Sequence, residues 1–362
     1  MPERNEYLKF DPLPYMLLAL QEFLALRQYL PIVDARSESE FRAGHIPGAV
    51  NLPLLNDSER VAVGTTYKQQ GRDQAIRLGF RLVGPRLEQL VGDGVATAGE
   101  RRKLLVYCWR GGMRSSNLAG FIRMAGVDTS TLNGGYKAYR RAALEAFSPP
   151  LPLLVIGGMT GTGKTDILKA LAAAGEQVID LEGLANHKGS AFGGLMKGLQ
   201  PTTEQFQNDL FEQILRIDRS RPVWIEDESI AIGRIFLPDP FWSQKKDAPV
   251  LEVMLDRDRR VDRLVSEYGP ADKDEFLAAM VKITKKLGGQ HFNAARDLLL
   301  AGDMHGTISI LLNYYDKNYQ ASLENKKDQI LERLSWQGTD KDELIADLIS
   351  ASRKHSGRIG TC

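Results

Sequence analysis

The chain has 362 residues, a length that suggests about two domains, each able to bury its own hydrophobic core. It carries 47 lysines and arginines against 46 acidic residues, and 43% of its residues are hydrophobic. That balance excludes a disordered chain, a coiled coil and a uniformly basic nucleic-acid coat protein. No apolar run approaches the roughly 18 residues of a membrane span, and no basic-then-apolar leader opens the chain, so we expect a cytoplasmic protein with no membrane partner. With only two cysteines, Cys108 and Cys362, a disulfide framework and a cysteine-based zinc site are also excluded.

The first part of the chain alternates short apolar runs with helix-forming segments. Ser37 and Glu40 have the spacing of a capping box, which predicts a short helix over residues 37–42. Alternation of strands and helices favours a parallel sheet. The predicted strands cover residues 29–35, 50–54 and 104–107, and a further predicted helix covers residues 115–125.

A proline-rich stretch at residues 147–152 is the clearest boundary in the sequence. Its three prolines cannot continue a helix and favour an extended linker. Beyond it, apolar runs again alternate with amphipathic helices, which predicts a second parallel sheet, and from about residue 271 onward the pattern is helical only. The apolar runs cover residues 153–156, 177–181, 223–225 and 250–255, and the clearest helix covers residues 204–217.

Cys108 ends an apolar strand and is followed by a glycine-rich turn and the start of a helix. Backbone N–H groups and the helix dipole stabilise an anion at such a position. Arginines nearby add positive charge, so we expect a reactive, thiolate-rich Cys108 rather than a buried structural cysteine. The residues predicted to cradle an anionic donor are Arg110, Gly111, Gly112, Met113 and Arg114.

The spacing from Cys108 to Arg114 is C-x5-R, which cysteine-dependent phosphatases use to surround a tetrahedral phosphate. A cradle of this width suits a donor that carries a phosphoryl-like group. A phosphatase is the alternative, although Tyr107 stands where such enzymes usually place a histidine.

The segment from Asp34 to Asn51 resembles the rhodanese signature, in which an acid and an arginine follow a strand and precede a G-H-I-P-G-A-x-N turn. Together with the Cys108 loop, the resemblance covers about residues 12–145. It implies a domain that carries sulfur or selenium on Cys108 as a persulfide or selenosulfide. It also implies that His45 and Asn51 are structural, and that Asp34 and Arg36 form a supporting ion pair.

Residues 158–165 have the phosphate-loop pattern G-x-x-x-x-G-K-T, directly after a predicted strand and before an amphipathic helix over residues 166–174. In such a loop, backbone amides around Gly158, Gly161 and Gly163 cradle a diphosphate. Lys164 would reach the terminal oxygens, and the Thr165 hydroxyl can hold Mg²⁺. The pattern does not distinguish a nucleotide from another diphosphate.

Acidic residues end two of the predicted strands near this loop. Asp227 is predicted to contact Mg²⁺ indirectly, with Glu226 and Glu228 as alternatives. Asp180 would orient the substrate or a base, or cap a helix. Four arginines (Arg257, Arg259, Arg260 and Arg263) open a later helix that would form either a lid over the phosphates or a solvated face.

Basic residues are concentrated in the first half despite the balanced total. Residues 101–145 contain nine lysines and arginines against two acids, and aromatic residues lie among them. Phosphate contacts combined with base stacking are a common mode of RNA binding, although a solvated face is the alternative for any such run. The candidate tRNA-binding residues are Lys68, Arg72, Arg101, Arg102, Lys137 and Arg140.

A rhodanese-like domain followed by a phosphate-loop domain is an unusual pairing, and further stretches make the chain resemble the bacterial tRNA 2-selenouridine synthase family over nearly its whole length. These stretches cover residues 51–68, 108–115, 180–193, 226–229 and 314–317. The resemblance implies conversion of wobble 2-thiouridine in a tRNA anticodon loop to 2-selenouridine, with selenophosphate as donor. It also implies S-geranylation of the thiouridine by geranyl diphosphate, which would then be the ligand of the phosphate loop.

The predicted fold is α/β, with an N-terminal rhodanese-like domain and a P-loop NTPase-like parallel-sheet domain that has a helical C-terminal extension. The expected bounds are residues 12–146, a linker at 147–152, 153–270 and 271–362. No tightly bound cofactor is expected, and a selenophosphate-producing enzyme is a further candidate partner. Two rival functions are a rhodanese sulfurtransferase fused to an ATP-dependent kinase-like or ligase-like domain, and a tRNA-binding regulator. The oligomeric state is left open.

Overall fold

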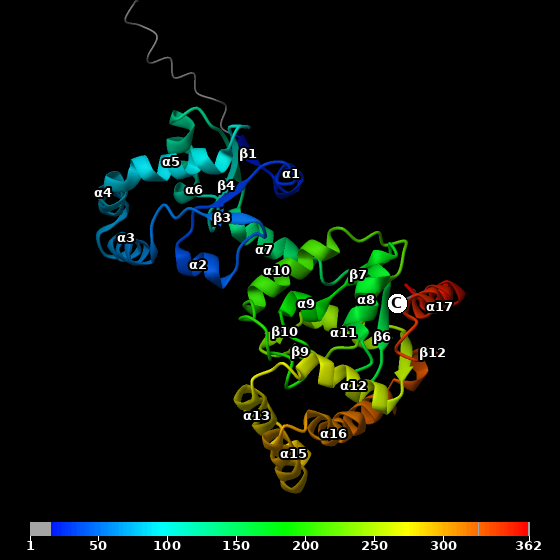
Figure 1. Cartoon of the computed structure of the whole chain (residues 1–362). Coiled ribbons are helices and arrows are strands. Elements are labelled where there is room, and N and C mark those ends of the chain that lie inside the picture. Colours follow the sequence, from blue (N-terminus) through cyan, green and yellow to red (C-terminus); the bar gives the residue numbers. More distant parts are fainter. Residues whose placement is uncertain (1–15, 325, 361–362) are drawn as a thin grey trace, which may run out of the picture. The chain divides into compact units, whose positions relative to one another are not determined.

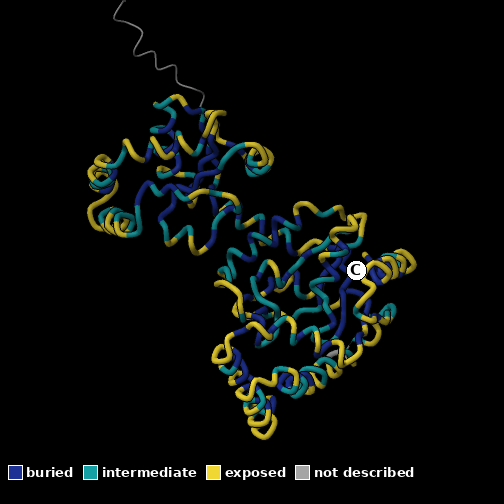
Figure 2. The backbone as a smooth tube through the Cα atoms, viewed as in Figure 1, coloured by how far each residue is buried: buried dark blue, intermediate teal, exposed yellow. Residues whose placement is uncertain are grey.

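The computed structural model of the chain describes residues 16–324 and 326–360, and it divides into two compact units, residues 1–145 and residues 146–362 (Figure 1). The division falls just before the proline-rich stretch. Both units are α/β. In each of them the central strands are buried and the helices around them present exposed residues on their outer faces (Figure 2).

The N-terminal unit contains a five-stranded sheet of order β1-β5-β4-β2-β3 in which every neighbouring pair is parallel. Parallel neighbours need long crossover connections, and helices supply most of these. The strands are β1 (Met16–Leu18), β2 (Ile32–Asp34), β3 (Ala49–Asn51), β4 (Lys103–Tyr107) and β5 (Asp128–Leu132). The helices are α1 (Leu20–Leu26), α2 (Glu38–Ala43), α3 (Asp57–Gln70), α4 (Arg72–Val83), α5 (Leu87–Ala98), α6 (Met113–Met124) and α7 (Gly135–Glu145).

Local sequence signals account for these elements closely. The capping box at the start of α2 is confirmed, because the Ser37 N–H donates to the Glu40 carboxylate over 3.2 Å. Two predicted strands are longer than those observed: β2 begins after Pro31, and β3 ends before Pro53. A proline has no N–H to donate to a sheet, so both strands stop short of one.

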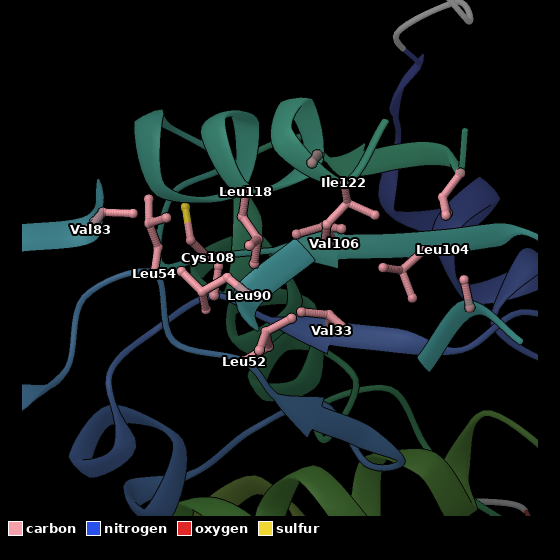
Figure 3. Close-up of a cluster of buried hydrophobic side chains, with 14 of the residues drawn as sticks. Val33, Leu52, Leu54, Val83, Leu90, Leu104, Val106, Cys108, Leu118 and Ile122 are labelled. Atoms are coloured by element: carbon pink, nitrogen blue, oxygen red, sulfur yellow. The ribbon is translucent and has the colours of Figure 1, made fainter. Parts of the chain in front are cut away.

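The core of this unit lies between the sheet and helices α5 and α6 (Figure 3). Val33, Leu104 and Val106 from the strands meet Leu118 and Ile122 from α6, all buried. Cys108 belongs to the same buried cluster, at the end of β4. The apolar core therefore fixes the strand end on which the candidate cysteine lies.

The second unit has a parallel sheet of order β12-β11-β6-β8-β7 and a small antiparallel hairpin of β9 and β10. Its strands are β6 (Leu153–Gly157), β7 (Gln177–Ile179), β8 (Val223–Glu226), β9 (Ala231–Ile232), β10 (Ile235–Phe236), β11 (Val250–Leu255) and β12 (Ile330–Trp336). Its helices are α8 (Lys164–Ala173), α9 (Leu181–Ala185), α10 (Thr203–Ile214), α11 (Asp239–Asp247), α12 (Arg257–Tyr268), α13 (Lys273–Val281), α14 (Thr284–Leu287), α15 (Gly289–Ala301), α16 (Met304–Glu324) and α17 (Lys341–Lys354).

The C-terminal region is helical, as predicted, except for one strand. β12 pairs in parallel with β11 along its length and forms an edge of the sheet, so the expectation of helices alone from residue 271 onward is wrong at residues 330–336. Glu332 and Arg333 interrupt the apolar pattern there. An edge strand tolerates such charges. These charges hide the alternation of apolar and polar residues from which a strand would be predicted.

Helices α12 to α16 build a second apolar cluster beside the sheet. Phe192, Tyr268 and Phe276 pack within it, with the rings of Phe192 and Phe276 stacked at 4.7 Å between centroids. Among residues 16–324 and 326–360, no helix is both long enough and apolar enough to cross a membrane.

Candidate active sites

Cys108 follows the carboxyl end of β4, and the loop after it leads into α6. Its side chain is buried, with Sγ 3.3 Å from the Gly112 N–H, which donates to it, and 3.1 Å from the Ser115 hydroxyl oxygen. The loop therefore supplies polar contacts to the sulfur from the first turn of α6. Such contacts favour an anionic sulfur or selenium at this position.

Glycines shape the loop because other backbone passes very close to it. Gly111 has φ +66°, and a Cβ there would lie 2.5 Å from the Leu132 carbonyl oxygen. A Cβ on Gly135 would lie 2.3 Å from the Cys108 carbonyl oxygen. The Tyr136 N–H donates to that same oxygen over 2.8 Å. The start of α7 thus braces the loop from behind, and neither glycine can be enlarged without moving it.

Arg114, the arginine of the C-x5-R spacing, is bound to an acid from another helix. Its two terminal nitrogens lie 2.5 and 3.2 Å from the carboxylate oxygens of Glu40. Burial alone would raise the pKa of Glu40, but the guanidinium of Arg114 holds that pKa below its usual value. Arg110 is exposed on the loop. The predicted cradle thus contains one exposed arginine and one arginine already paired.

Asp34 and Arg36 form a fully buried ion pair at the end of β2. Arg36 donates Nε and Nη2 to Asp34 Oδ2 over 2.9 and 2.7 Å. The guanidinium also lies 3.9 Å from the ring centroid of Tyr136 and donates to the Gly44 carbonyl. Asn51 donates its amide to the carbonyls of both residues of the pair. These contacts tie β2, β3 and α7 together, which fits the predicted supporting role.

The phosphate loop connects β6 to α8 in the second unit. Gly161 and Gly163 have φ +85° and +88°, and a Cβ on Gly163 would lie 2.5 Å from Nη2 of Arg263. Lys164 donates its ammonium to the Gly158 carbonyl over 2.9 Å, back across the loop. The loop is therefore folded tightly around the position that a phosphate group takes in this motif.

Two contacts to this loop come from residues that the sequence did not single out. The Gly158 N–H donates to the Tyr319 hydroxyl of α16 over 2.5 Å. The Thr165 hydroxyl donates to Oε2 of Glu182 over 2.7 Å. Glu182 lies in the first turn of α9, directly after β7, and an acid just beyond a strand next to β8 is a signal that could have identified it.

The acids at the end of β8 have three different environments. Asp227 accepts from Lys326 and Lys245 over 2.5 and 3.4 Å. Burial would raise the pKa of Asp227, but these two lysines hold it below its usual value. Glu226 is fully buried, and burial raises its pKa well above the usual value. Burial and the nearby charge of Glu182 raise the pKa of Glu228 to about 8.

Thr165, Glu182 and Glu228 are the residues here that can hold Mg²⁺. They offer oxygen donors beside the loop, and Mg²⁺ in such sites takes few protein ligands because waters and substrate phosphates complete its shell. Within the described part of the chain, no group of three or more His, Cys, Asp and Glu residues is arranged to hold a metal ion. Asp227 as the Mg²⁺ contact stays a prediction, and its two lysine partners would have to be displaced. Asp180 caps α9, accepting from the Gly183 N–H over 2.7 Å.

Of the four arginines of α12, Arg260 and Arg263 are anchored by ion pairs rather than free to act as a lid. Arg260 binds Asp316 of α16 through two nitrogens, at 2.7 and 2.8 Å. Arg263 donates to Asp166 over 2.6 Å and lies 5.2 Å from the ring centroid of Trp336. These contacts join α8, α12, α16 and β12 around the loop.

A cavity of about 370 Å³ opens over the phosphate loop. Its lining includes Lys164 and Thr165 of the loop, and Lys188, which is bound to Glu267. Tyr268, Tyr315 and Tyr319 also line it. The cavity therefore combines phosphate-binding residues with aromatic side chains.

The candidate tRNA-binding residues do not form a single group. Lys68 and Arg72 are exposed where α3 passes into α4, and Lys137 is exposed in the first turn of α7. The Lys137 N–H donates to the carbonyl of Trp109 in the cysteine loop, over 2.9 Å. Lys137 is therefore beside the Cys108 loop. Arg140 lies one turn further along α7 and is half-buried.

Arg101 and Arg102 lie at the other end of β4. At about 3.3 Å per residue, Arg102 lies six residues and thus roughly 20 Å from Cys108, and Arg101 lies further away. Arg101 donates to the Tyr29 carbonyl, and Arg102 donates to the carbonyls of Ala125 and Gly126. These arginines secure the chain at the amino ends of the strands, away from the cysteine.

Comparison with known proteins finds a family match in each of the two units. Residues 151–346 match the family described as "tRNA 2-selenouridine synthase AAA domain", and residues 19–142 match the rhodanese-like domain. The chain is 34% identical over 348 residues to a tRNA 2-selenouridine synthase of Nitrosomonas europaea, covering 82% of this chain and 90% of that protein. It is 36% identical over 344 residues to one of Shewanella sp. strain MR-7, covering 85% and 92%. The chain belongs to the tRNA 2-selenouridine synthase family.

Proposed function

We propose that this protein is a transferase that converts wobble 2-thiouridine in tRNA to 2-selenouridine, with selenophosphate as selenium donor and with an S-geranylated intermediate made from geranyl diphosphate. One observation carries the proposal. A chain that matches the family over most of its length holds a buried cysteine against a helix N-terminus in one unit and a phosphate loop with its lysine and threonine in the other. Selenium transfer needs a nucleophilic cysteine, and geranylation needs a loop that binds diphosphate.

Prenyl transfer is assigned to the phosphate loop. The thiouridine sulfur attacks C1 of the geranyl group, the C–O bond to diphosphate breaks, and diphosphate leaves with the electron pair while N3 of the base loses a proton. Loop amides and Lys164 would bind the leaving diphosphate, and Mg²⁺, held at Thr165, would neutralise its charge. The tyrosine faces of the cavity can stabilise positive charge that develops on the allylic carbon.

Selenium transfer is assigned to the Cys108 loop. Alkylation turns the thiocarbonyl sulfur into a thiol leaving group, so a selenium nucleophile can displace geranyl thiol from C2. Over the whole step, selenophosphate and water react with the S-geranyl base to give 2-selenouridine, geranyl thiol and phosphate. The net reaction involves no oxidation or reduction.

A carrier role for Cys108 adds one two-electron oxidation and one two-electron reduction, which cancel each other. The S–Se bond forms as water takes the phosphoryl group of selenophosphate, and two electrons pass to an acceptor of the disulfide class. The terminal selenium then attacks C2, and geranyl thiolate leaves and takes a proton. Two thiols reduce the resulting Se–S bond, which frees the 2-selenouridine and restores Cys108. The Gly112 N–H and the Ser115 hydroxyl contact the position of the carrier sulfur.

Nucleoside mass spectrometry tests the proposal directly. An anticodon stem-loop that contains 2-thiouridine is incubated with the protein, Mg²⁺, geranyl diphosphate, selenophosphate and a thiol. We expect S-geranyl-2-thiouridine to appear first and 2-selenouridine to follow. An unchanged RNA together with ATP hydrolysis would contradict the proposal and favour a sulfurtransferase fused to an ATP-dependent domain.

A further inference from the structure

A second cavity lies in the N-terminal unit, apart from the phosphate loop. Its volume is about 310 Å³, and it is enclosed by α3, α4, α6 and the segment after β3. Most of its lining is aliphatic or aromatic. The side chains that matter below are Leu54, Val83, Tyr67, Phe80, Met113 and Arg114.

This cavity is next to the cysteine loop. Met113 and Arg114, on its wall, directly follow Gly112, whose N–H donates to the Cys108 sulfur. Leu54 and Val83, also on its wall, belong to the same buried cluster as Cys108. Figure 3 shows the Cys108 sulfur directed to the end of the cluster where these two side chains lie. The cavity thus lies beside the cysteine loop, and Cys108 itself is not one of its lining residues.

Several side chains at the cavity are exposed in a way that packing alone does not explain. Tyr67 is 58% exposed, Phe80 63% and Met113 51%. Large exposed hydrophobic side chains that converge on one cavity indicate a binding site. Arg72, which is exposed, adds positive charge to the same lining, and this suits a ligand attached to a phosphate backbone.

We propose that this cavity binds the geranyl chain of S-geranyl-2-thiouridine while the modified base is presented to Cys108. This inference rests on the proposed function and names a subsite of its selenium-transfer step. A mostly apolar cavity of about 310 Å³ falls in the size range of small-molecule sites and has room for a ten-carbon chain. The chain would be held from tRNA binding until the C2–S bond breaks and geranyl thiol leaves.

A mainly apolar pocket near the phosphate loop, lined by Phe192, Tyr268, Phe276 and neighbouring residues, has a volume of only about 20 Å³. The 370 Å³ cavity over the loop is lined by many charged and polar residues. Of these three cavities, the one beside the cysteine loop is therefore both large and mostly apolar. This placement predicts that the geranyl chain governs recognition in the second step, after prenyl transfer.

Gly79 offers a clean way to fill the cavity. It lies in α4 and lines the cavity, and a Cβ built there has no atom within 4 Å. A leucine at this position therefore projects into free space and also suits a helix better than glycine. Gly92 of α5 is a matched control, because it too is a helical glycine with free space and does not line the cavity.

The test uses synthetic anticodon stem-loops that carry S-geranyl-2-thiouridine or its S-methyl analogue, with binding measured by fluorescence anisotropy and conversion by mass spectrometry. For the native protein we expect the geranyl RNA to bind at least about tenfold more tightly than the methyl RNA. The Gly79→Leu variant should lose most of that preference and convert geranyl RNA more slowly, whereas Gly92→Leu keeps both. Geranylation of 2-thiouridine RNA should be unchanged in either variant.

Two results with the Gly79→Leu variant would overturn the inference. One is an unchanged chain-length preference in Gly79→Leu. The other is a loss of geranylation in that variant with normal conversion of preformed geranyl RNA, which would assign the cavity to the prenyl donor. An independent measurement uses the native protein alone: affinity should rise from methyl through five-carbon to ten-carbon chains and gain nothing at fifteen carbons. A continued gain at fifteen carbons, or none between methyl and geranyl, also overturns it.

Failure of the proposed function is distinguishable from failure of this inference. If the native protein does not make S-geranyl RNA from geranyl diphosphate, the proposed first step is wrong. The synthetic geranyl RNA still reports whether the cavity binds the chain, because that RNA does not depend on the phosphate loop.

Discussion

The guanidinium of Arg114 lies 2.5 Å from the carboxylate of Glu40, an acid that stands 74 residues earlier in the chain. Glu40 also accepts from the Ser37 N–H at the start of α2. One carboxylate thus caps a helix and neutralises the arginine that completes the C-x5-R spacing. An anionic donor that enters the Cys108 loop competes with Glu40 for Arg114.

Removing the charge of Glu40 should therefore strengthen donor binding. Glutamine serves in a capping box as well as glutamate does, so Glu40→Gln keeps the cap and releases Arg114. We expect the KM for selenophosphate to fall by about threefold to fivefold, since an exposed to half-buried ion pair is worth up to about 1 kcal/mol. Steady-state selenation kinetics measure this, with Glu22→Gln in α1 as a control for loss of an exposed helix-start acid. A raised KM would show that Glu40 supports the site instead.

Replacing Cys108 by serine separates the two proposed steps. The variant keeps a small polar side chain near Gly112 and Ser115, so the fold should be preserved. We expect 2-selenouridine formation to fall by at least about a thousandfold, as is common when a nucleophile is lost, with geranylation of the RNA unchanged. Mass spectrometry of the intact protein should also show no added selenium atom. Selenation near the native rate would remove Cys108 from the reaction.

Lys164→Ala tests the phosphate loop in the opposite sense. Loss of one group that stabilises developing charge costs roughly a hundredfold to a thousandfold in rate, so geranylation should fall by that amount. Selenation of 2-thiouridine RNA should fall with it, whereas preformed S-geranyl RNA should still be converted. Lys246→Ala is the matched control, because Lys246 is an exposed lysine on α11 of the same unit. Normal selenation of thiouridine RNA in Lys164→Ala would break the ordered scheme.

The raised pKa of Glu228 should make the second unit less stable as the pH rises. The folded carboxyl has a pKa of about 8 against 4.5 in an unfolded chain, so the folded state holds a proton that the unfolded state has released. Between these values the free energy of unfolding falls with increasing pH. Glu228→Gln should flatten that dependence and raise stability near pH 8 by on the order of 1 kcal/mol.

Urea unfolding at pH 5, 6.5 and 8, followed by tryptophan fluorescence, measures this effect, because Trp224, Trp242 and Trp336 all lie in the second unit. Asp347→Asn, on an exposed position of α17, is the control. The prediction is wrong if the free energy of unfolding has the same slope against pH in the native protein and in Glu228→Gln.

The buried Asp34–Arg36 pair should be essential for stability of the first unit. Asp34→Asn leaves the guanidinium of Arg36 buried without its counter-charge. Such a loss typically lowers the free energy of unfolding by about 3–5 kcal/mol, which is about a third or more of the stability of a typical domain. Thermal unfolding should show a large loss. Arg42→Ala breaks an ion pair with Asp57 in which the arginine is 70% exposed, and it should cost less than about 1 kcal/mol.

Much of this arrangement follows from short-range sequence signals. The turn after β4, the capping box of α2 and the glycines before Lys164 could be predicted because the residues that cause them are neighbours in the chain. Not every partner of the sites could be predicted. Tyr319 is 161 residues from Gly158, and nothing local in the sequence encodes their contact. Glu182 directly follows a strand, which is a signal that could have identified it, but its contact with Thr165 depends on the adjacency of β7 and β8 in the sheet.

There is also a physical reason why the sequence pattern beyond residue 271 predicted helices alone and missed a strand. Period-2 alternation identifies a strand that has one buried face, and β12 mixes charged and apolar residues on a sheet edge, where most of its side chains are only partly buried. Its place is decided by the free edge of β11. Trp336 is the exception. It is buried at the end of β12, and its ring lies near Arg263.

The position of β12 also has a consequence for biosynthesis. The first unit can complete its sheet once residue 132 has left the ribosome, because all five of its strands have then been made. The second unit must wait about 200 residues longer, until residue 336 emerges, before β11 gains its outer neighbour and Trp336 reaches Arg263. From the synthesis of residue 255 until then, β11 offers an open edge while the chain is still growing. The half that is expected to carry selenium is therefore finished early, and the half with the phosphate loop is finished late.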